Sequence, residues 1–225
     1  MNYIKTLVVK FSNEIGNREI IPFRGAVIAS MDECDILFHN HKEEGYRYAY
    51  PLIQYKRIQK QATIICFGEG TDKIADFFTS KPLSLRINDK VEDVIVENLK
   101  AERTLIQTWN SPINYKLKSW LPLNGDNYKK YISTESLIER MQILEDILKG
   151  NILSALKGLG IHIEETIECH ITYLSDAKMV KFKNVKLMSF DIDFNSNISL
   201  PQYLGLGKHC SVGFGTLYNK RNKHQ

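Results

Sequence analysis

The 225-residue sequence contains few cysteines, and their positions argue against a zinc site. Cys34, Cys66, Cys169 and Cys210 form no Cys-x-x-Cys pair, the spacing that structural zinc sites commonly use. In a reducing compartment, scattered cysteines of this kind are free thiols, and most of them are buried. We therefore predict no metal site, and no other cofactor is expected for the chain.

The sequence also lacks long apolar segments. No stretch approaches the ~18 uninterrupted apolar residues of a membrane helix, and residues 1–5 do not begin a signal peptide. Apolar residues nevertheless make up 43% of the chain, which is enough for a packed core. These features predict a cytoplasmic protein without a membrane partner, built as one large domain or as two domains of about 110 residues each.

The first half of the chain has the residue pattern of a split βαβ unit. Its expected elements, in order, are strand 4–11, helix 19–31, strands 46–58 and 62–67, helix 71–79 with Thr71 or Asp72 as its cap, and one or two strands within 91–109. The order β-α-β-β-α-β is that of a ferredoxin-like domain. Gly25 lies inside the first expected helix, where glycine is unfavourable.

The second half begins near Ser111-Pro112 and repeats the same kinds of elements. We expect a long amphipathic helix over 134–159, capped by Ser133 or Thr134 and ended by Gly158 or Gly160. Strands 164–174 and 180–194 follow, the second with Lys181, Lys183 and Lys186, and strand 214–218 closes the chain. The predicted fold class is α+β, with two tandem ferredoxin-like (RRM-like) βαββαβ domains over residues 1–110 and 111–225.

A glycine-rich loop precedes the last expected strand. Residues 205–215 contain two Gly-x-Gly pairs, Gly205/Gly207 and Gly213/Gly215, with Lys208 between them. Glycine permits positive φ and close approach of a ligand, so several N–H groups could point outward and hold a phosphate beside the lysine. The pattern is neither a Walker loop nor a dinucleotide fingerprint, because Lys208 is directly followed by His209 rather than by Ser or Thr, and no βαβ unit follows the loop. A purely structural loop is the alternative.

Acidic residues are absent from the segment that contains this loop. Residues 201–225 hold four basic residues and no Asp or Glu, so their net charge of +4 equals that of the whole chain. A basic terminus is commonly only solvated, but beside a phosphate-binding loop it favours a polyanionic partner. His209, inside the loop, is expected to contact phosphate rather than to catalyse.

The best candidates for catalysis are two histidines that follow the first expected helix. His39 and His41 are two residues apart, so an extended chain points both to one side, and Tyr46 and Tyr48 follow closely. Such groups suit cleavage of RNA by its own 2′-hydroxyl, in which one group removes the 2′ proton and another protonates the departing 5′ oxygen. Solvated histidines, a chance metal-binding pair and a tyrosine-lined strand face are the alternatives. His162, His170 and His224 are expected to be structural or solvated.

Together these residues resemble a known superfamily. The pattern Gly-φ-Gly-x5-Gly-φ-Gly, with φ apolar and a lysine in the gap, is similar to the glycine-rich loop of the RAMP proteins of CRISPR systems. More narrowly, the chain resembles the endoribonucleases that cut the precursor CRISPR RNA within its repeats. Pro22–Ala26, Tyr50–Lys56 and Phe67–Gly70 carry the rest of this resemblance.

The resemblance implies two ferredoxin-like domains and metal-independent cleavage that leaves a 2′,3′-cyclic phosphate. It places the catalytic histidine at His39 or His41, with Tyr46 or Tyr48 assisting. The residues expected to bind RNA are Gly205, Gly207, Lys208, His209, Gly213, Gly215, Lys181 and Lys183. The expected partner is CRISPR repeat RNA, and a homodimer or other CRISPR-associated subunits stay open.

Two alternative functions follow from the same residues. A non-catalytic RNA-binding RAMP subunit of a CRISPR effector complex would keep the glycine loop but would not need the histidine and tyrosine cluster. A binder of nucleotides or small phosphates would use the glycine loop alone.

Overall fold

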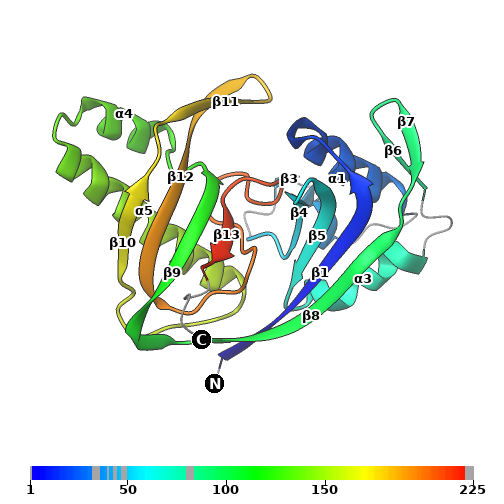
Figure 1. Ribbon diagram of the computed structural model, residues 1–225, viewed down its shortest axis with the longest axis horizontal. Coiled ribbons are helices and arrows are strands. Elements are labelled where there is room, and N and C mark those ends of the chain that lie inside the picture. The colour runs from blue at the N-terminus through cyan, green and yellow to red at the C-terminus, as the bar shows by residue number, and fades with distance from the viewer. Residues whose placement is uncertain are drawn as a thin grey trace. The chain divides into compact units, whose positions relative to one another are not determined.

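The computed structural model describes residues 2–31, 36–39, 41–42, 45–46, 50–79 and 84–220 (Figure 1). These residues divide into two compact units. The N-terminal unit comprises residues 3–104 together with Ser211–Gly213 of the glycine loop, and the C-terminal unit comprises residues 105–210 and 214–220 with Asn2. The glycine loop is thus shared, because its centre belongs to the N-terminal unit and its two ends to the C-terminal unit.

The main sheet of the N-terminal unit is ferredoxin-like. Its elements are β1 (Asn2–Glu14), η1 (Asn17–Glu19), α1 (Ile20–Ala29), α2 (Ile36–His39), β2 (His41–Lys42), β3 (Gly45–Tyr46), β4 (Ile53–Ile58), β5 (Gln61–Phe67), α3 (Gly70–Thr79), β6 (Ser84–Ile87), β7 (Lys90–Asp93) and β8 (Val96–Ile106). The sheet order is β4-β5-β1-β8, with β1 antiparallel to β5 and β5 antiparallel to β4. This is the strand order of the predicted fold, and it leaves β4 at one edge.

Aromatic side chains join the helices of this unit to its sheet. Phe23 of α1 and Phe77 of α3 both pack edge-on against Phe11 of β1, with ring centroids 5.9 and 6.2 Å apart. All three rings are fully buried. The two helices therefore cover the same face of the sheet, and the expected helix over 19–31 forms as α1 although it contains Gly25.

The predicted start of α3 was wrong by about one residue. The helix begins at Gly70, and Thr71 donates its hydroxyl to the carbonyl of Gly68 at 2.7 Å instead of capping the helix. A Cβ at Gly70 would lie 2.9 Å from the carbonyl oxygen of Leu52. A contact distant in sequence therefore favours glycine at the first position of this helix.

The C-terminal unit has the same strand order, but a loop stands where the ferredoxin-like pattern has its second helix. Its elements are β9 (Thr108–Trp120), α4 (Gly125–Ser133), α5 (Leu137–Gly158), β10 (Cys169–Leu174), β11 (Lys178–Phe182), β12 (Val185–Ile198) and β13 (Thr216–Asn219). The sheet order is β10-β12-β9-β13, and β11 pairs only with β12, forming a hairpin (Figure 1). Residues 199–215, all of which the structure describes, contain no helix. The glycine loop thus replaces the second helix of the ferredoxin-like pattern.

The long helix of this unit starts later than predicted. Ser136 is its N-cap, and its hydroxyl accepts a hydrogen bond from the N–H of Glu139 at 3.4 Å. Ser133 and Thr134 instead lie at the C-terminal end of α4, a helix the sequence did not predict, where both hydroxyls donate to the carbonyl of Lys130. The predicted cap was therefore wrong, because these short polar side chains serve a helix C-terminus equally well.

The C-terminal end of α5 was predicted correctly. The helix ends at Gly158, and Gly160 adopts a φ of +71° two residues later. The N–H of Ile161 then donates to the carbonyl of Leu156 at 2.8 Å. This is the glycine-terminated helix end that the sequence indicated.

The described cysteines are buried, as the sequence indicated. Cys66, Cys169 and Cys210 form no disulfide, burial raises the pKa of the Cys66 thiol, and Cys34 lies outside the described residues. Over the described ranges, no group of three His, Cys, Asp or Glu side chains could hold a metal ion. In the same part of the chain, no helix combines the length and the apolar character needed to cross a membrane.

Candidate nucleic-acid interface and catalytic segment

The glycines at the ends of the loop are required by packing within the C-terminal unit. Gly207 has a φ of +85°, and a Cβ there would lie 2.9 Å from the indole ring of Trp120. Gly215 has a φ of +55°, and a Cβ there would lie 1.8 Å from the carbonyl oxygen of Leu206. These two glycines allow backbone and a buried indole to meet without a side chain between them.

The backbone N–H groups of the loop are partly used inside the protein. Lys208 donates its N–H to the carbonyl of Leu121 at 3.2 Å, and Gly215 donates to the carbonyl of Ser119 at 3.0 Å. The sequence indicated that such groups could point outward to a phosphate. Two of them, on Lys208 and Gly215, instead tie the loop to the end of β9 and are not available to a ligand.

The other two glycines lie at different places. Gly205 forms an isolated antiparallel bridge with Thr216 at the start of β13. Gly213 belongs to the N-terminal unit, has a φ of +90°, and would place a Cβ 2.6 Å from Cδ1 of Ile20 in α1. Gly213 thus packs within the N-terminal unit, and the other three glycines of the loop belong to the C-terminal unit.

Side chains around the loop form a basic, aromatic surface on the C-terminal unit. The ring of His209 stacks on Phe182 of β11, with centroids 3.8 Å apart and planes 20° apart, and Phe214 packs edge-on to Phe182 at 5.9 Å. Lys183, at the turn of the β11–β12 hairpin, and Lys208 are exposed and raise the positive potential at His209. We call these five residues the basic aromatic patch.

The other predicted cations take different positions. Lys181 pairs in register with Lys186, and because successive side chains of a strand alternate, it lies on the opposite face of β11 from Phe182. Lys220 is 2.7 Å from the carboxylate of Asp193, so its charge is already paired. Arg221 and Lys223 lie outside the described residues.

The aromatic members of the patch were missed in the sequence, although a signal for them was present. Phe182 stands between two lysines and Phe214 between two glycines, and an aromatic side chain interleaved with basic residues or glycines is typical of nucleic-acid surfaces. Their meeting with His209 was not predictable, because it depends on how the hairpin and the loop pack.

The pKa of His209 is lowered in this setting. Part of the side chain reaches solvent, but the ring face against Phe182 is covered, and this burial is the main cause; the positive charges of Lys208 and Lys183 add to it. The ring is therefore neutral at pH 7, a flat aromatic surface flanked by two cations.

This shift predicts a specific loss of stability in acid. Because the unfolded state, with a histidine pKa of about 6.5, binds the proton more tightly than the folded state, the contribution of His209 is complete above that pH and is lost as the pH falls through the lower folded pKa. Urea unfolding followed from neutral to acidic pH should show a steeper loss for the wild type than for His209→Gln. Parallel curves for the two proteins would contradict the prediction.

The predicted catalytic residues lie in the N-terminal unit. His39 is the last residue of α2, and His41 in β2 pairs in register with Tyr46 in β3. Tyr48 and the side chains of His39, His41 and Tyr46 lie outside the described part of the structure. The backbone thus brings the positions of His41 and Tyr46 opposite each other across two short antiparallel strands.

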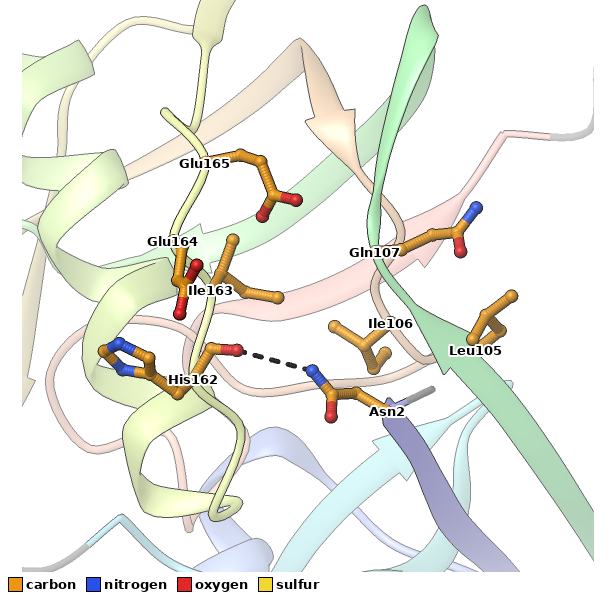
Figure 2. Close-up of a pocket in the computed structure, with 8 residues that line it drawn as sticks. All are labelled: Asn2, Leu105, Ile106, Gln107, His162, Ile163, Glu164 and Glu165. Carbon is orange, nitrogen blue, oxygen red and sulfur yellow. Dashed lines mark hydrogen bonds between the residues drawn. The ribbon is translucent and has the colours of Figure 1, made fainter.

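A small polar cavity elsewhere in the C-terminal unit contains none of the predicted RNA-binding or catalytic residues. It measures about 250 Å³ and is lined by Asn2, Leu105, Ile106, Gln107, His162, Ile163, Glu164 and Glu165. Asn2 donates its side-chain amide to the carbonyl of His162 at 3.3 Å (Figure 2). Its volume falls below the range of about 300–1,000 Å³ typical of ligand pockets, so it does not compete with the patch as a candidate site.

Comparison with known proteins decides the family. A family model described as the Cas6b N-terminal domain matches residues 2–105, and one described as the Cas6b C-terminal domain matches residues 107–220. The chain belongs to the Cas6b family. The resemblance to CRISPR repeat-processing endoribonucleases that the sequence indicated is therefore confirmed.

Three proteins illustrate what this chain is similar to. A crystal structure of Cas6b is 29% identical, with a TM-score of 0.89 over 97% of this chain and 100% of that chain. A crystal structure of Cas6b described as a CRISPR RNA processing endoribonuclease is 28% identical, with a TM-score of 0.75 over the same shares. An uncharacterised protein of Methanocaldococcus jannaschii is 38% identical over 47% of this chain and 71% of its own length. The predicted fold of two tandem ferredoxin-like domains is confirmed.

Proposed function

We propose that this Cas6b protein is a cytoplasmic, metal-independent endoribonuclease that cuts CRISPR repeat RNA to give mature guide RNAs. The observation that carries the proposal is the match of both Cas6b domains to nearly the whole chain. The N-terminal domain, residues 1–110, would supply the catalytic residues, and the C-terminal domain, residues 111–225, the glycine loop.

The proposed reaction uses the RNA as its own nucleophile. One of His39 and His41 removes the proton from the 2′-hydroxyl, the oxygen attacks the adjacent phosphorus, and the other histidine protonates the departing 5′ oxygen or binds the phosphate. Tyr46 or Tyr48 assists. The bond from phosphorus to the 5′ oxygen breaks, which leaves a 2′,3′-cyclic phosphate and a free 5′-hydroxyl. Positive charge nearby stabilises the additional negative charge of the phosphorane.

The proposed RNA contacts lie on the basic aromatic patch. Its stacked rings offer a surface for an unpaired base, and Lys183 and Lys208 lie where they can neutralise phosphates. The N–H groups of Lys208 and Gly215 are bonded internally, so these side chains supply phosphate contacts that those two groups do not.

Removing either patch lysine should weaken RNA binding without regard to sequence. Lys183→Ala and Lys208→Ala are each expected to reduce the slope of log affinity against log salt concentration by about 0.7, because one phosphate contact and its released counterion are lost. Fluorescence anisotropy across a salt series measures this slope. Lys157→Ala, at the exposed C-terminal end of α5, is the matched control and should leave it unchanged. Equal slopes for all four proteins would remove the patch from the RNA interface.

The proposed activity is tested with repeat RNA in the presence of EDTA. The wild type should cut the RNA and leave a 2′,3′-cyclic phosphate, which resists phosphatase until acid opens the ring. A matched RNA with a 2′-deoxy nucleotide just upstream of the cut should bind with similar affinity and stay intact. Cleavage of the deoxy substrate would overturn the internal-nucleophile mechanism. Binding without cleavage of the all-ribose RNA would replace the enzyme with a non-catalytic RAMP subunit.

A further inference from the structure

Two neighbouring residues of β4 contact the two ends of the segment that carries the candidate catalytic residues. The first is Gln54, whose side chain is fully buried. Its Nε2 donates to the hydroxyl of Tyr50 at 2.9 Å and to the carbonyl of Pro51 at 3.0 Å. Both distances are those of ordinary hydrogen bonds, so Gln54 holds the chain at the point where the segment from His39 to Tyr48 has just ended.

The second residue, Tyr55, contacts the point where that segment begins. Its ring is fully buried and packs edge-on against Phe23 of α1 at 6.0 Å. Its hydroxyl lies 3.4 Å from the carbonyl oxygen of Phe38 and donates to it. Phe38 immediately precedes His39 and is itself buried, so the start of the segment is held by packing and by this long hydrogen bond.

The backbone of Tyr55 is held in turn by the glycine loop. Because β4 is an edge strand, its outer N–H groups have no strand partner in the main sheet. The N–H of Tyr55 donates to the carbonyl of Ser211 at 2.7 Å, and Tyr55 forms a parallel bridge with Val212. The centre of the glycine loop therefore extends the same sheet that anchors the histidine segment.

We infer that Gln54 and Tyr55 are positioning residues for cleavage. Their side chains fix both ends of the segment that carries His39, His41, Tyr46 and Tyr48. The glycine loop is hydrogen-bonded to β4, the strand that carries both residues. The inference rests on the proposed function. Successive side chains of a strand point to opposite faces, so the two anchors act through separate contacts. General acid–base catalysis depends on such placement, since a shift of about 1 Å can cost on the order of a hundredfold in rate.

Substitution of Gln54 can test positioning of the segment without a large loss of folding stability. Its Oε1 is buried and accepts no hydrogen bond from the described residues. An unpaired buried oxygen disfavours folding, so Gln54→Leu removes a penalty together with the two anchoring bonds, and its net effect on stability is small. A loss of activity in this variant would therefore not be a loss of folded protein.

The first test is single-turnover cleavage of repeat RNA by Gln54→Leu and Tyr55→Phe. Each variant should cut on the order of tenfold more slowly, with an RNA dissociation constant within about twofold of the wild type, because placement and not binding is changed. Tyr115→Phe is the matched control. Tyr115 is a buried tyrosine of the C-terminal unit whose hydroxyl donates to the carbonyl of Ile198 at 2.9 Å, and its variant should cut at the wild-type rate.

The second test needs no activity. Hydrogen exchange of the free protein should be faster in Tyr55→Phe for peptides that contain Ile36–His39, faster in Gln54→Leu for peptides that contain residues 50–52, and unchanged in both regions in Tyr115→Phe. Wild-type exchange and cleavage rates in both β4 variants would overturn the inference, as would equal slowing by Tyr115→Phe. If the wild type fails to cut any repeat RNA, the proposed function falls, and unchanged exchange in both β4 variants would overturn the anchoring contacts independently.

Discussion

Replacing both His39 and His41 with alanine should abolish cleavage of repeat RNA, with a fall of at least about 10³-fold in the single-turnover rate. A general acid or base typically contributes about 10²- to 10⁴-fold, and the double variant removes both histidine candidates for these roles. Neither histidine would then be present to remove the 2′ proton or to protonate the departing 5′ oxygen. RNA affinity should change little, because most of the proposed phosphate contacts lie on the patch. Rapid-quench cleavage and anisotropy on the same RNA measure the two quantities.

Single variants and a control make this result specific. His170, exposed in β10 of the C-terminal unit, is the control, and His170→Ala should cut at the wild-type rate. If one histidine is the base and the other the acid, His39→Ala and His41→Ala should each remove a different limb of the pH–rate profile. Undiminished cutting by the double variant would show that neither histidine is catalytic and would leave Tyr46 and Tyr48 as the candidates.

Replacing Gly215 with alanine should severely destabilise the protein. The added Cβ would lie 1.8 Å from the carbonyl oxygen of Leu206, and the φ of +55° is one that alanine adopts only at a cost. The clash is with backbone, and Leu206 also donates its N–H to the carbonyl of Gly215 at 2.8 Å, so neither partner can move without breaking the loop. We expect a loss of more than about 4 kcal/mol in unfolding free energy, seen in thermal unfolding as a Tm lower by on the order of 10 °C.

Gly150, in the same unit, is the control position, because alanine there should stabilise the protein instead of destabilising it. It is exposed within α5, and a Cβ there would meet nothing within 4 Å. Gly150→Ala should therefore raise stability by about 0.5–1 kcal/mol, since alanine restricts the unfolded chain and favours the helix. A Gly215→Ala variant as stable as the wild type would mean that the loop rearranges, and would contradict the packing role of that glycine.

The elements predicted best are those with strong local signals. The apolar stripe of α5 buries Leu144, Leu148, Ile152 and Leu156, and Gly160 ends the helix as expected. Periodic burial and a positive φ depend on residues a few positions apart, which a sequence displays directly. Leu137, the first residue of the helix, is instead 69% exposed.

Two of the predictions that failed depended on contacts distant in sequence. A Cβ at Gly70, the first residue of α3, would lie 2.9 Å from the carbonyl oxygen of Leu52. Two N–H groups of the glycine loop turn inward because carbonyls of the 119–121 segment accept them. These partners are far away in the chain, so no local pattern reveals them. The third failure is local, because Ser133 and Thr134 suit a helix start as well as a helix end, and their hydroxyls bond to a carbonyl of α4.

By itself the sequence determined the fold class, the family and the chemical types of the candidate residues, because periodicity, glycine spacing and side-chain chemistry are local properties. Only the tertiary structure decided what those residues contact. It stacks His209 on Phe182, separates Lys181 from the patch, and assigns Ser211–Gly213 to the edge of β4 beside Tyr55. The physical reason is that hydrogen bonds and packing act over a few ångströms, and folding alone brings residues from distant parts of the chain within that range.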